Sequence, residues 1–164
     1  MAKVISPPPA QDLYEEDFPL WAERQAALLR ARRFEQLDLD NLIEEVEDLS
    51  RRERKSVESY AETIVEHLLK LTVSPSNRPR RGWLVTVDKL RVKLARELTA
   101  TLRSHLRAEL PALYRGLRRP VARQLEKDGV GLEALPAACP YTLDQVLDPE
   151  WYPDNVHGNR DPTL

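Results

Sequence analysis

Leucine recurs at every fourth position from Leu90 to Leu110, and this repeat restricts the fold more strongly than any other feature of the sequence. The positions are Leu90, Leu94, Leu98, Leu102, Leu106 and Leu110. Four residues turn an α-helix by about 400°, so each leucine lies about 40° further round the same helix. The repeat predicts one central helix from Trp83 to Leu110 that faces one neighbour at its start and another at its end.

Apolar residues at helical spacing predict three more helices. Asp17 and Asp38 can cap the first two, and Asp128-Gly129 is a stop signal for the last. With five glycines and two phenylalanines, the chain lacks the turn and aromatic residues of an all-β fold. We expect an all-α fold, an antiparallel bundle of four main helices over about residues 17–33, 38–72, 83–110 and 111–127.

The expected domain organisation follows from the prolines and the ends of these helices. Residues 1–12 contain Ser6-Pro7-Pro8-Pro9 and are expected to form a flexible, proline-rich arm. Residues 13–153 are expected to form a single helical domain, and residues 154–164 a loose C-terminal tail.

The stretch Thr142–Gln145 predicts a short helix near the C-terminus. Thr142 at the N-cap and Gln145 three residues later have the form of a capping box. Trp151 and Tyr152 follow as an apolar patch that we expect to dock onto the bundle. Cys139 lies just before this helix, and without a basic neighbour it is expected to be a buried, inert thiol.

Charge is distributed unevenly although the net charge is only −2. Residues 1–60, 61–127 and 128–164 carry −5, +9 and −6, respectively. The basic middle has two interpretations: it complements the acidic ends within one fold, or it binds nucleic acid. On the second interpretation the candidate residues are Arg80, Arg81, Trp83, Arg91 and Arg96, with Trp83 able to stack on a base.

The sequence lacks the signals of secretion and of membrane insertion. One cysteine cannot form an internal disulfide, and no run approaches the roughly 18 apolar residues of a membrane span. We therefore expect a cytoplasmic protein with no membrane partner. Phosphate loops, dinucleotide-binding fingerprints and Cys-x-x-Cys pairs do not occur either.

Three ionisable residues of the second predicted helix form the best candidate catalytic or metal site. Helical geometry places Glu53 and His67 on the apolar side and Glu45 beside it. This carboxylate–histidine set could bind a divalent metal and support a metal-assisted hydrolase. Alternatively, His67 orders the core, and the cluster Glu44, Glu45, Glu47 and Asp48 complements the helix dipole on a solvated surface. We favour this alternative, in which no cofactor is needed.

Four motifs together resemble an uncharacterised bacterial family, the domain of unknown function twenty-nine. The motifs are LYEEDFPLW (Leu13–Trp21), LDLDNLIEEVEDL (Leu37–Leu49), EHLLK (Glu66–Lys70) and CPYTLDQVLDPEWYP (Cys139–Pro153). The resemblance covers about Leu13 to Pro153 and implies an all-helical fold. It implies no activity, because none is established for the family.

The leading functional hypothesis is a non-enzymatic interaction or regulatory module of the bacterial cytoplasm. It rests on the absence of a convincing catalytic set, and its expected partner is another protein or a second copy of the chain. The metal-assisted hydrolase and nucleic-acid binding remain as alternatives.

Overall fold

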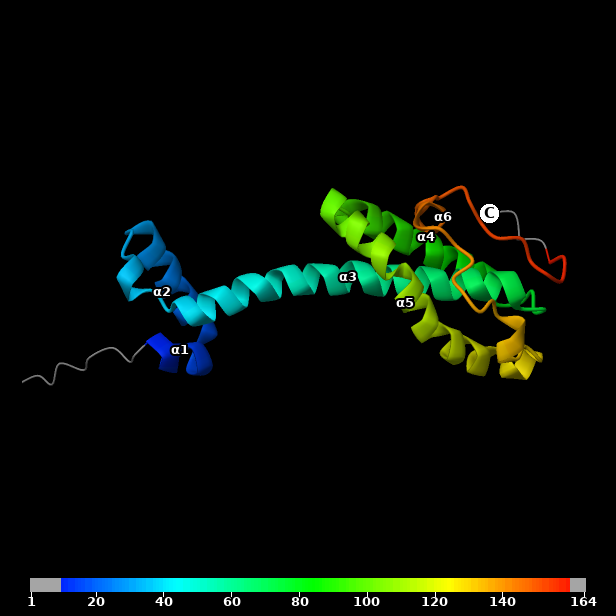
Figure 1. Ribbon diagram of the computed structural model, residues 1–164, viewed down its shortest axis with the longest axis horizontal. Helices are drawn as coiled ribbons and strands as arrows, with labels where there is room; N and C mark the ends of the chain where they lie inside the picture. The colour runs from blue at the N-terminus through cyan, green and yellow to red at the C-terminus, as the bar shows by residue number, and fades with distance from the viewer. Residues whose placement is uncertain (1–9, 160–164) are drawn as a thin grey trace, which may run out of the picture. The chain divides into compact units, whose positions relative to one another are not determined.

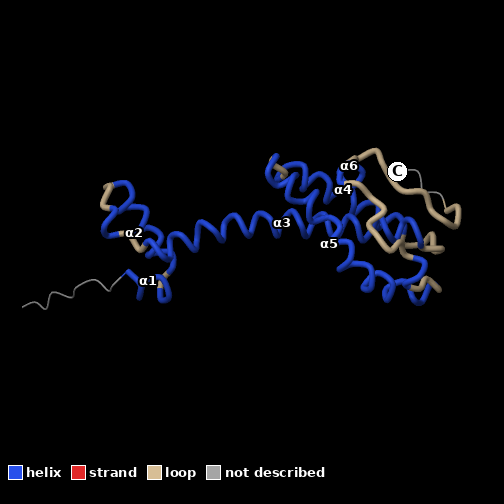
Figure 2. The backbone as a smooth tube through the Cα atoms, in the orientation of Figure 1, coloured by secondary structure: helices blue, strands red, loops and turns tan. Residues whose placement is uncertain are grey.

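The computed structural model describes residues 10–159, and these residues form an all-α structure. The helices, labelled in Figure 1, are α1 (Ala10–Glu16), α2 (Phe18–Arg30), α3 (Leu39–Val73), α4 (Arg80–Glu97), α5 (Ala100–Leu125) and α6 (Leu143–Leu147). Short 3₁₀ turns occur at Phe34–Gln36, Glu126–Asp128 and Leu132–Ala134. Figure 2 shows only helix and loop over the described residues. The all-α prediction is confirmed.

Backbone contacts divide the chain into two compact units, Met1–Arg52 and Glu53–Leu164. Helix α3 begins in the first unit and ends in the second. We describe each unit by itself and refer to them as the first unit and the second unit.

The first unit is organised by a buried polar contact at the start of α3. Asp17 caps α2 as predicted, since its side chain accepts a hydrogen bond from the backbone N–H of Leu20. On the buried face of α2, the Trp21 indole donates to the Asp38 carboxylate at 3.0 Å. The Gln25 side-chain oxygen accepts from the Asp38 backbone N–H, also at 3.0 Å. These bonds hold the end of the α2–α3 connection against α2.

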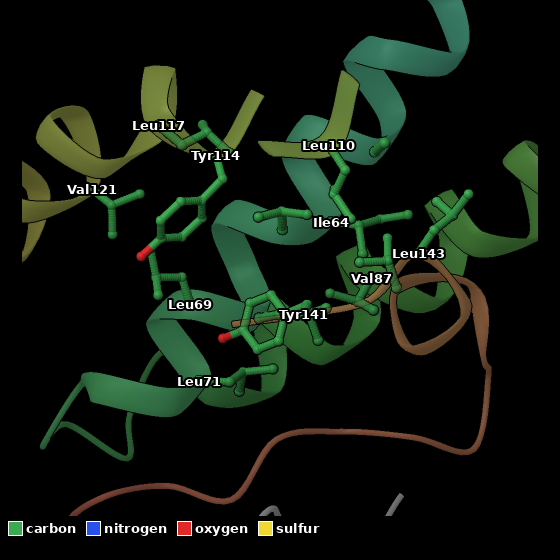
Figure 3. Close-up of a cluster of buried hydrophobic side chains, with 14 of the residues drawn as sticks. Ile64, Leu69, Leu71, Val87, Leu110, Tyr114, Leu117, Val121, Tyr141 and Leu143 are labelled. Atoms are coloured by element: carbon green, nitrogen blue, oxygen red, sulfur yellow. The ribbon is translucent and has the colours of Figure 1, made fainter. Parts of the chain in front are cut away.

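The second unit contains the main hydrophobic core. The C-terminal half of α3 contributes Val57, Ile64 and Leu68, each with 0% of its surface exposed. Helices α4, α5 and α6 add apolar side chains to the same cluster. Figure 3 shows Tyr114, Leu117 and Val121 of α5 in this cluster, with Tyr141 and Leu143 from the C-terminal segment. Trp151 and Tyr152 are partly buried against the same cluster, so the predicted docking of this patch is confirmed.

The predicted helix 83–110 is wrong in its extent. Helix α4 ends at Glu97, Leu98 is extended, and Thr99 caps α5 by accepting a hydrogen bond from the N–H of Leu102. Pro111, predicted as a helix start, lies inside α5. The leucine repeat is a spacing in the sequence, and each of the two helices fits it separately. It therefore continues through the residues where α4 ends and α5 begins. Thr99, a good N-cap residue, was the signal in the sequence for the break.

Both predicted ends of the domain differ from the structure. Residues 10–12, expected in the arm, belong to α1, whereas residues 1–9 lie outside the described residues. Residues 154–159, expected to be loose, are hydrogen bonded: the Asn155 side-chain amide donates to the carbonyls of Leu71, Thr72 and Ser74 at 2.7, 3.2 and 3.0 Å. The last carbonyls of a helix have no N–H partner within the helix, and here the Asn155 side-chain amide donates hydrogen bonds to carbonyls at the end of α3. Residues 160–164 lie outside the described residues.

The predicted capping box of α6 is present and gives a testable stability difference. Thr142 Oγ1 accepts from the Gln145 N–H, and the Gln145 side chain accepts from the Thr142 N–H at 2.9 Å. We expect Thr142→Ala to lower the free energy of unfolding by about 1 kcal/mol in urea titrations. Thr86→Ala is the matched control, because the Thr86 hydroxyl donates to Gly82 within α4 and caps nothing. A loss in the control as large as in Thr142→Ala would contradict the capping role.

Candidate functional site

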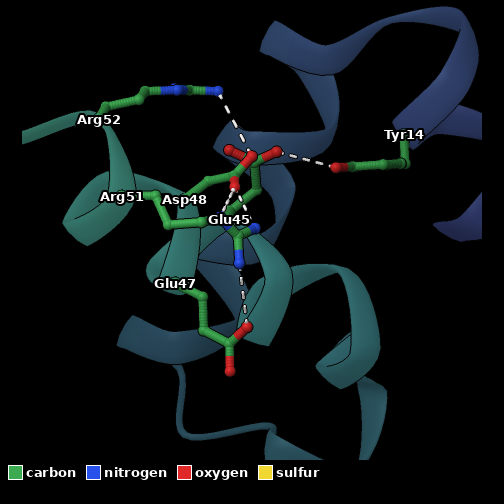
Figure 4. A network of polar contacts seen from close by, with 6 residues as sticks. All are labelled: Tyr14, Glu45, Glu47, Asp48, Arg51 and Arg52. Atoms are coloured by element: carbon green, nitrogen blue, oxygen red, sulfur yellow. Dashed lines mark hydrogen bonds and ion pairs between the residues drawn. The ribbon is translucent and has the colours of Figure 1, made fainter. Parts of the chain in front are cut away.

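Glu45 lies in a polar network of the first unit. Its carboxylate accepts a hydrogen bond from the Tyr14 hydroxyl at 2.8 Å (Figure 4). This bond, together with burial and the charge of Glu45, raises the pKa of Tyr14 to about 12, so the tyrosine stays a donor at neutral pH. Nearby, Arg51 pairs with Asp48, which is half-buried, and with the exposed Glu47 (Figure 4). The acidic cluster of α3 is thus partly neutralised by arginines one turn further on.

Glu53 and His67 belong to the second unit and do not converge on one another. Glu53 is exposed, contrary to the prediction that it faces the core, and His67 is half-buried. The 14 residues between them correspond to about 21 Å along α3. Over the described residues, no group of three or more His, Cys, Asp or Glu side chains could hold a metal ion. Glu45 belongs to the first unit, and within the second unit the structure does not bring Glu53 and His67 together.

His67 makes a local contact that fixes its ring. Its Nδ1 lies 2.8 Å from the carbonyl of Thr63, one turn earlier in α3. Burial lowers the pKa of His67 below its ordinary value of 6.5, although the hydrogen bond to Thr63 opposes this shift. The neutral ring with a proton on Nδ1 satisfies this geometry, as in the interpretation that His67 orders the core.

The lowered pKa of His67 predicts a pH dependence of stability. As the pH falls, the ring takes up a proton at a higher pH in the unfolded chain than in the folded chain. The contribution of His67 to the free energy of unfolding is therefore complete above pH 6.5 and is lost as the pH falls below that value. We expect urea titrations from pH 7.5 to pH 5 to show a larger loss of stability in wild type than in His67→Gln. Equal losses in both proteins, or a His67 pKa above 6.5 by NMR, would contradict this account.

Two of the five candidate nucleic-acid residues are buried by the second unit itself. Arg80 is 1% exposed, and its guanidinium donates to the carbonyl of Leu71 at 2.8 Å. Trp83 is half-buried against the core, with the Lys70 ammonium 6.0 Å from its ring centre. Arg81 and Arg96 are exposed on α4. Only these two retain the exposure that binding a phosphate backbone requires.

Arg91 is the other buried arginine, and it holds the C-terminal segment. Its Nε donates to the Val146 carbonyl at 3.0 Å, and Nη2 donates to Gln145 and Trp151 at 3.1 and 2.9 Å. The guanidinium carbon also lies 4.8 Å from the ring centre of Tyr152. Burial lowers the pKa of Arg91, but an arginine stays charged at neutral pH. Arg91 is thus an internal clamp rather than a surface cation.

A pocket of about 490 Å³ opens beside this clamp, between α4 and the segment after α6. Its lining is mainly apolar, with Val92 and Ala95 on α4 opposite Leu147 and Pro149. The Tyr152 hydroxyl donates to Asp88 at the polar end, and burial together with this hydrogen bond raises the pKa of Tyr152 to about 12. At that end Asp88 accepts from Tyr152, Glu150 is exposed, and Arg91 donates through Nε and Nη2, whereas its Nη1 is buried without a hydrogen-bond partner among the described residues.

An exposed apolar strip on the N-terminal part of α3 is the feature that the sequence analysis missed. We call it the α3 ridge; its residues are Leu39, Ile43, Val46 and Leu49, which are 55%, 57%, 64% and 58% exposed. Spacings of four, three and three residues place these side chains along one side of a helix. Val46 and Leu49 continue the helical spacing of Val57 and Ile64, yet the structure buries only Val57 and Ile64.

The comparisons with known proteins give a family and no activity. The family model of the domain of unknown function DUF29 matches residues 13–152. The chain belongs to this family. No curated protein and no solved structure matched the chain.

The DUF29 match includes both features that the structure singles out. The α3 ridge and the Arg91 clamp lie within residues 13–152. Among residues 10–159, no helix is long and apolar enough to cross a membrane. The first unit also exposes Phe18, Leu20, Leu29 and Phe34, and the α3 ridge groups four exposed apolar residues on one side of a single helix.

Proposed function

We propose that this DUF29 protein is a protein-interaction module that binds through the α3 ridge of its first unit. The observation that carries the proposal is the exposure of Leu39, Ile43, Val46 and Leu49, each more than half exposed, on one side of α3. Single exposed apolar residues are common on protein surfaces, but a continuous apolar strip is typical of a surface that another molecule covers.

The small core of the first unit supports this proposal. Between residues 13 and 52, the buried side chains are Leu13, Trp21, Gln25 and Asp38, of which two are polar. Units of about 40 residues rarely bury enough apolar surface to be stable without a disulfide, a metal or association with another chain. The only cysteine of the chain is Cys139, in the second unit, so no disulfide can stabilise the first unit. Association through the ridge would supply the missing apolar burial.

Charge restricts the class of partner. Residues 10–52 contain 12 Asp and Glu against 6 Arg, a net charge of −6. Nucleic acid and anionic membrane surfaces would be repelled by such a unit. The proposal is therefore a protein partner that presents apolar side chains to the ridge.

Photo-crosslinking in cells tests the proposal. p-Benzoylphenylalanine introduced at position 46 should give a protein adduct on irradiation, because this position lies on the ridge. The same residue introduced at position 59, which is exposed on α3 in the second unit, is the matched control. An adduct at 46 with none at 59 supports the proposal. No adduct at 46, or equal adducts at both positions, would exclude the ridge as a binding surface.

A further inference from the structure

We infer that the ridge is covered by a second copy of this chain, with two α3 helices antiparallel and Val46 at the twofold axis. The inference rests on the proposed function and specifies its partner. It is carried by two properties of residues 39–52: the positions of the apolar side chains and the order of the charges.

The apolar side chains are self-complementary about Val46. Ile43 lies three residues before Val46 and Leu49 three residues after it. In an antiparallel pair centred on Val46, Ile43 of each copy lies opposite Leu49 of the other, and the two Val46 side chains meet. All three residues are more than half exposed, so α1 and α2 leave these side chains uncovered.

The charges favour antiparallel over parallel pairing. Asp40 lies six residues before Val46, and Arg51 and Arg52 lie five and six residues after it. Antiparallel pairing places Asp40 of one copy beside these arginines of the other. Parallel pairing in register would instead place Asp40 against Asp40 and the arginines against the arginines, and like charges at a helix pair destabilise it. The acids Glu44, Glu45, Glu47 and Asp48 lie against acids of the second copy in both orientations, so the ends of this segment alone distinguish them.

Arg51 and Arg52 can pair with a carboxylate of the second copy at a small cost in free energy. In the single chain Arg51 pairs with Glu47 and Asp48, and Arg52 lies 3.9 Å from Asp48. Arg51 and Arg52 retain 50% and 66% of their side-chain exposure, so these pairs are surface pairs of little energetic weight. A carboxylate from a second copy can join them without breaking a buried contact.

The apolar area of the ridge determines the affinity that we expect between two copies. Four side chains with about half their surface exposed offer roughly 300 to 400 Å² per copy, against roughly 800 Å² per partner in a standard interface. The dimer should therefore be weak and concentration-dependent, with a dissociation constant on the order of 10 to 100 µM. The net charge of −6 on residues 10–52 of each copy should weaken it further at low salt.

Cysteine crosslinking tests both the partner and the register. In a Cys139→Ser background, Val46→Cys should form an interchain disulfide on incubation of the purified full chain with oxidised glutathione. Leu39→Cys is the matched control, because antiparallel pairing separates the two copies of position 39 by 14 residues, about 21 Å along the helix. We expect at least tenfold more disulfide-linked dimer for Val46→Cys than for Leu39→Cys.

Two outcomes would overturn the inference. Equal crosslinking at positions 39 and 46 would indicate parallel pairing or random collision, and no crosslinking at 46 would show that the ridges of two copies do not meet. The failure is distinguishable from that of the proposed function: a photo-adduct at position 46 with a different protein would leave the interaction surface in place and exclude the second copy as its partner.

Discussion

Arg91→Met should lower the free energy of unfolding by about 3 to 5 kcal/mol, the range for breaking a buried charged network. Arg91 is 4% exposed and donates to the carbonyls of Gln145, Val146 and Trp151. A methionine fills much of the same volume but leaves these carbonyls without their donor. Urea titrations followed by circular dichroism measure the difference.

Two control variants separate the effect of the Arg91 hydrogen bonds on stability from the effect of losing a positive charge. Arg96→Met removes an exposed arginine from the same helix and should change stability by no more than about 0.5 kcal/mol. Arg91→Lys keeps the charge but lacks the several N–H donors of a guanidinium. Its loss of unfolding free energy should therefore fall between those of Arg96→Met and Arg91→Met. If Arg91→Met cost no more than Arg96→Met, the arginine would not hold the C-terminal segment.

Val57→Asp should lower the melting temperature by roughly 10 to 20 °C, because a buried, unpaired carboxylate costs several kcal/mol. Val57 has 0% exposure and belongs to the core of the second unit. Thermal melts at low micromolar protein concentration, below the dissociation constant expected for pairing through the ridge, provide the measurement.

Val46→Asp is the matched control on the same helix. Val46 is 64% exposed, so the new carboxylate stays in water and the melting temperature should stay within a few degrees of wild type. Similar losses for the two variants would show that the first half of α3 is also buried, contrary to the exposed ridge.

Much of the fold could be predicted from local patterns. Asp17 and Thr142 are N-caps as predicted, Thr142 with its predicted partner Gln145. Apolar spacing predicts α3 as one long helix, and its end at Val73 is within a residue of the prediction. The break between α4 and α5 was missed because the leucine repeat continues through Leu98, and the helix signal of the repeat outweighed the single N-cap signal of Thr99.

The site was harder to predict because a helical wheel shows which side chains share a face but not what covers that face. Arg80 and Arg91 were counted as surface cations, yet each donates to backbone carbonyls far away in the sequence or at a helix end. Glu53 lies on the apolar side of the wheel but is exposed. The same limitation hid the α3 ridge, whose apolar spacing is continuous with that of the buried stripe.

Sedimentation equilibrium of the purified full chain tests the central claim, that the α3 ridge joins two copies, most directly. The apparent mass of wild type should rise from the monomer mass of 18.9 kDa towards twice that value as concentration passes through the micromolar range. Val46→Asp should remain at 18.9 kDa throughout while keeping its helical circular dichroism. A wild-type chain that stays monomeric, or a Val46→Asp chain that dimerises as well as wild type, would contradict the account.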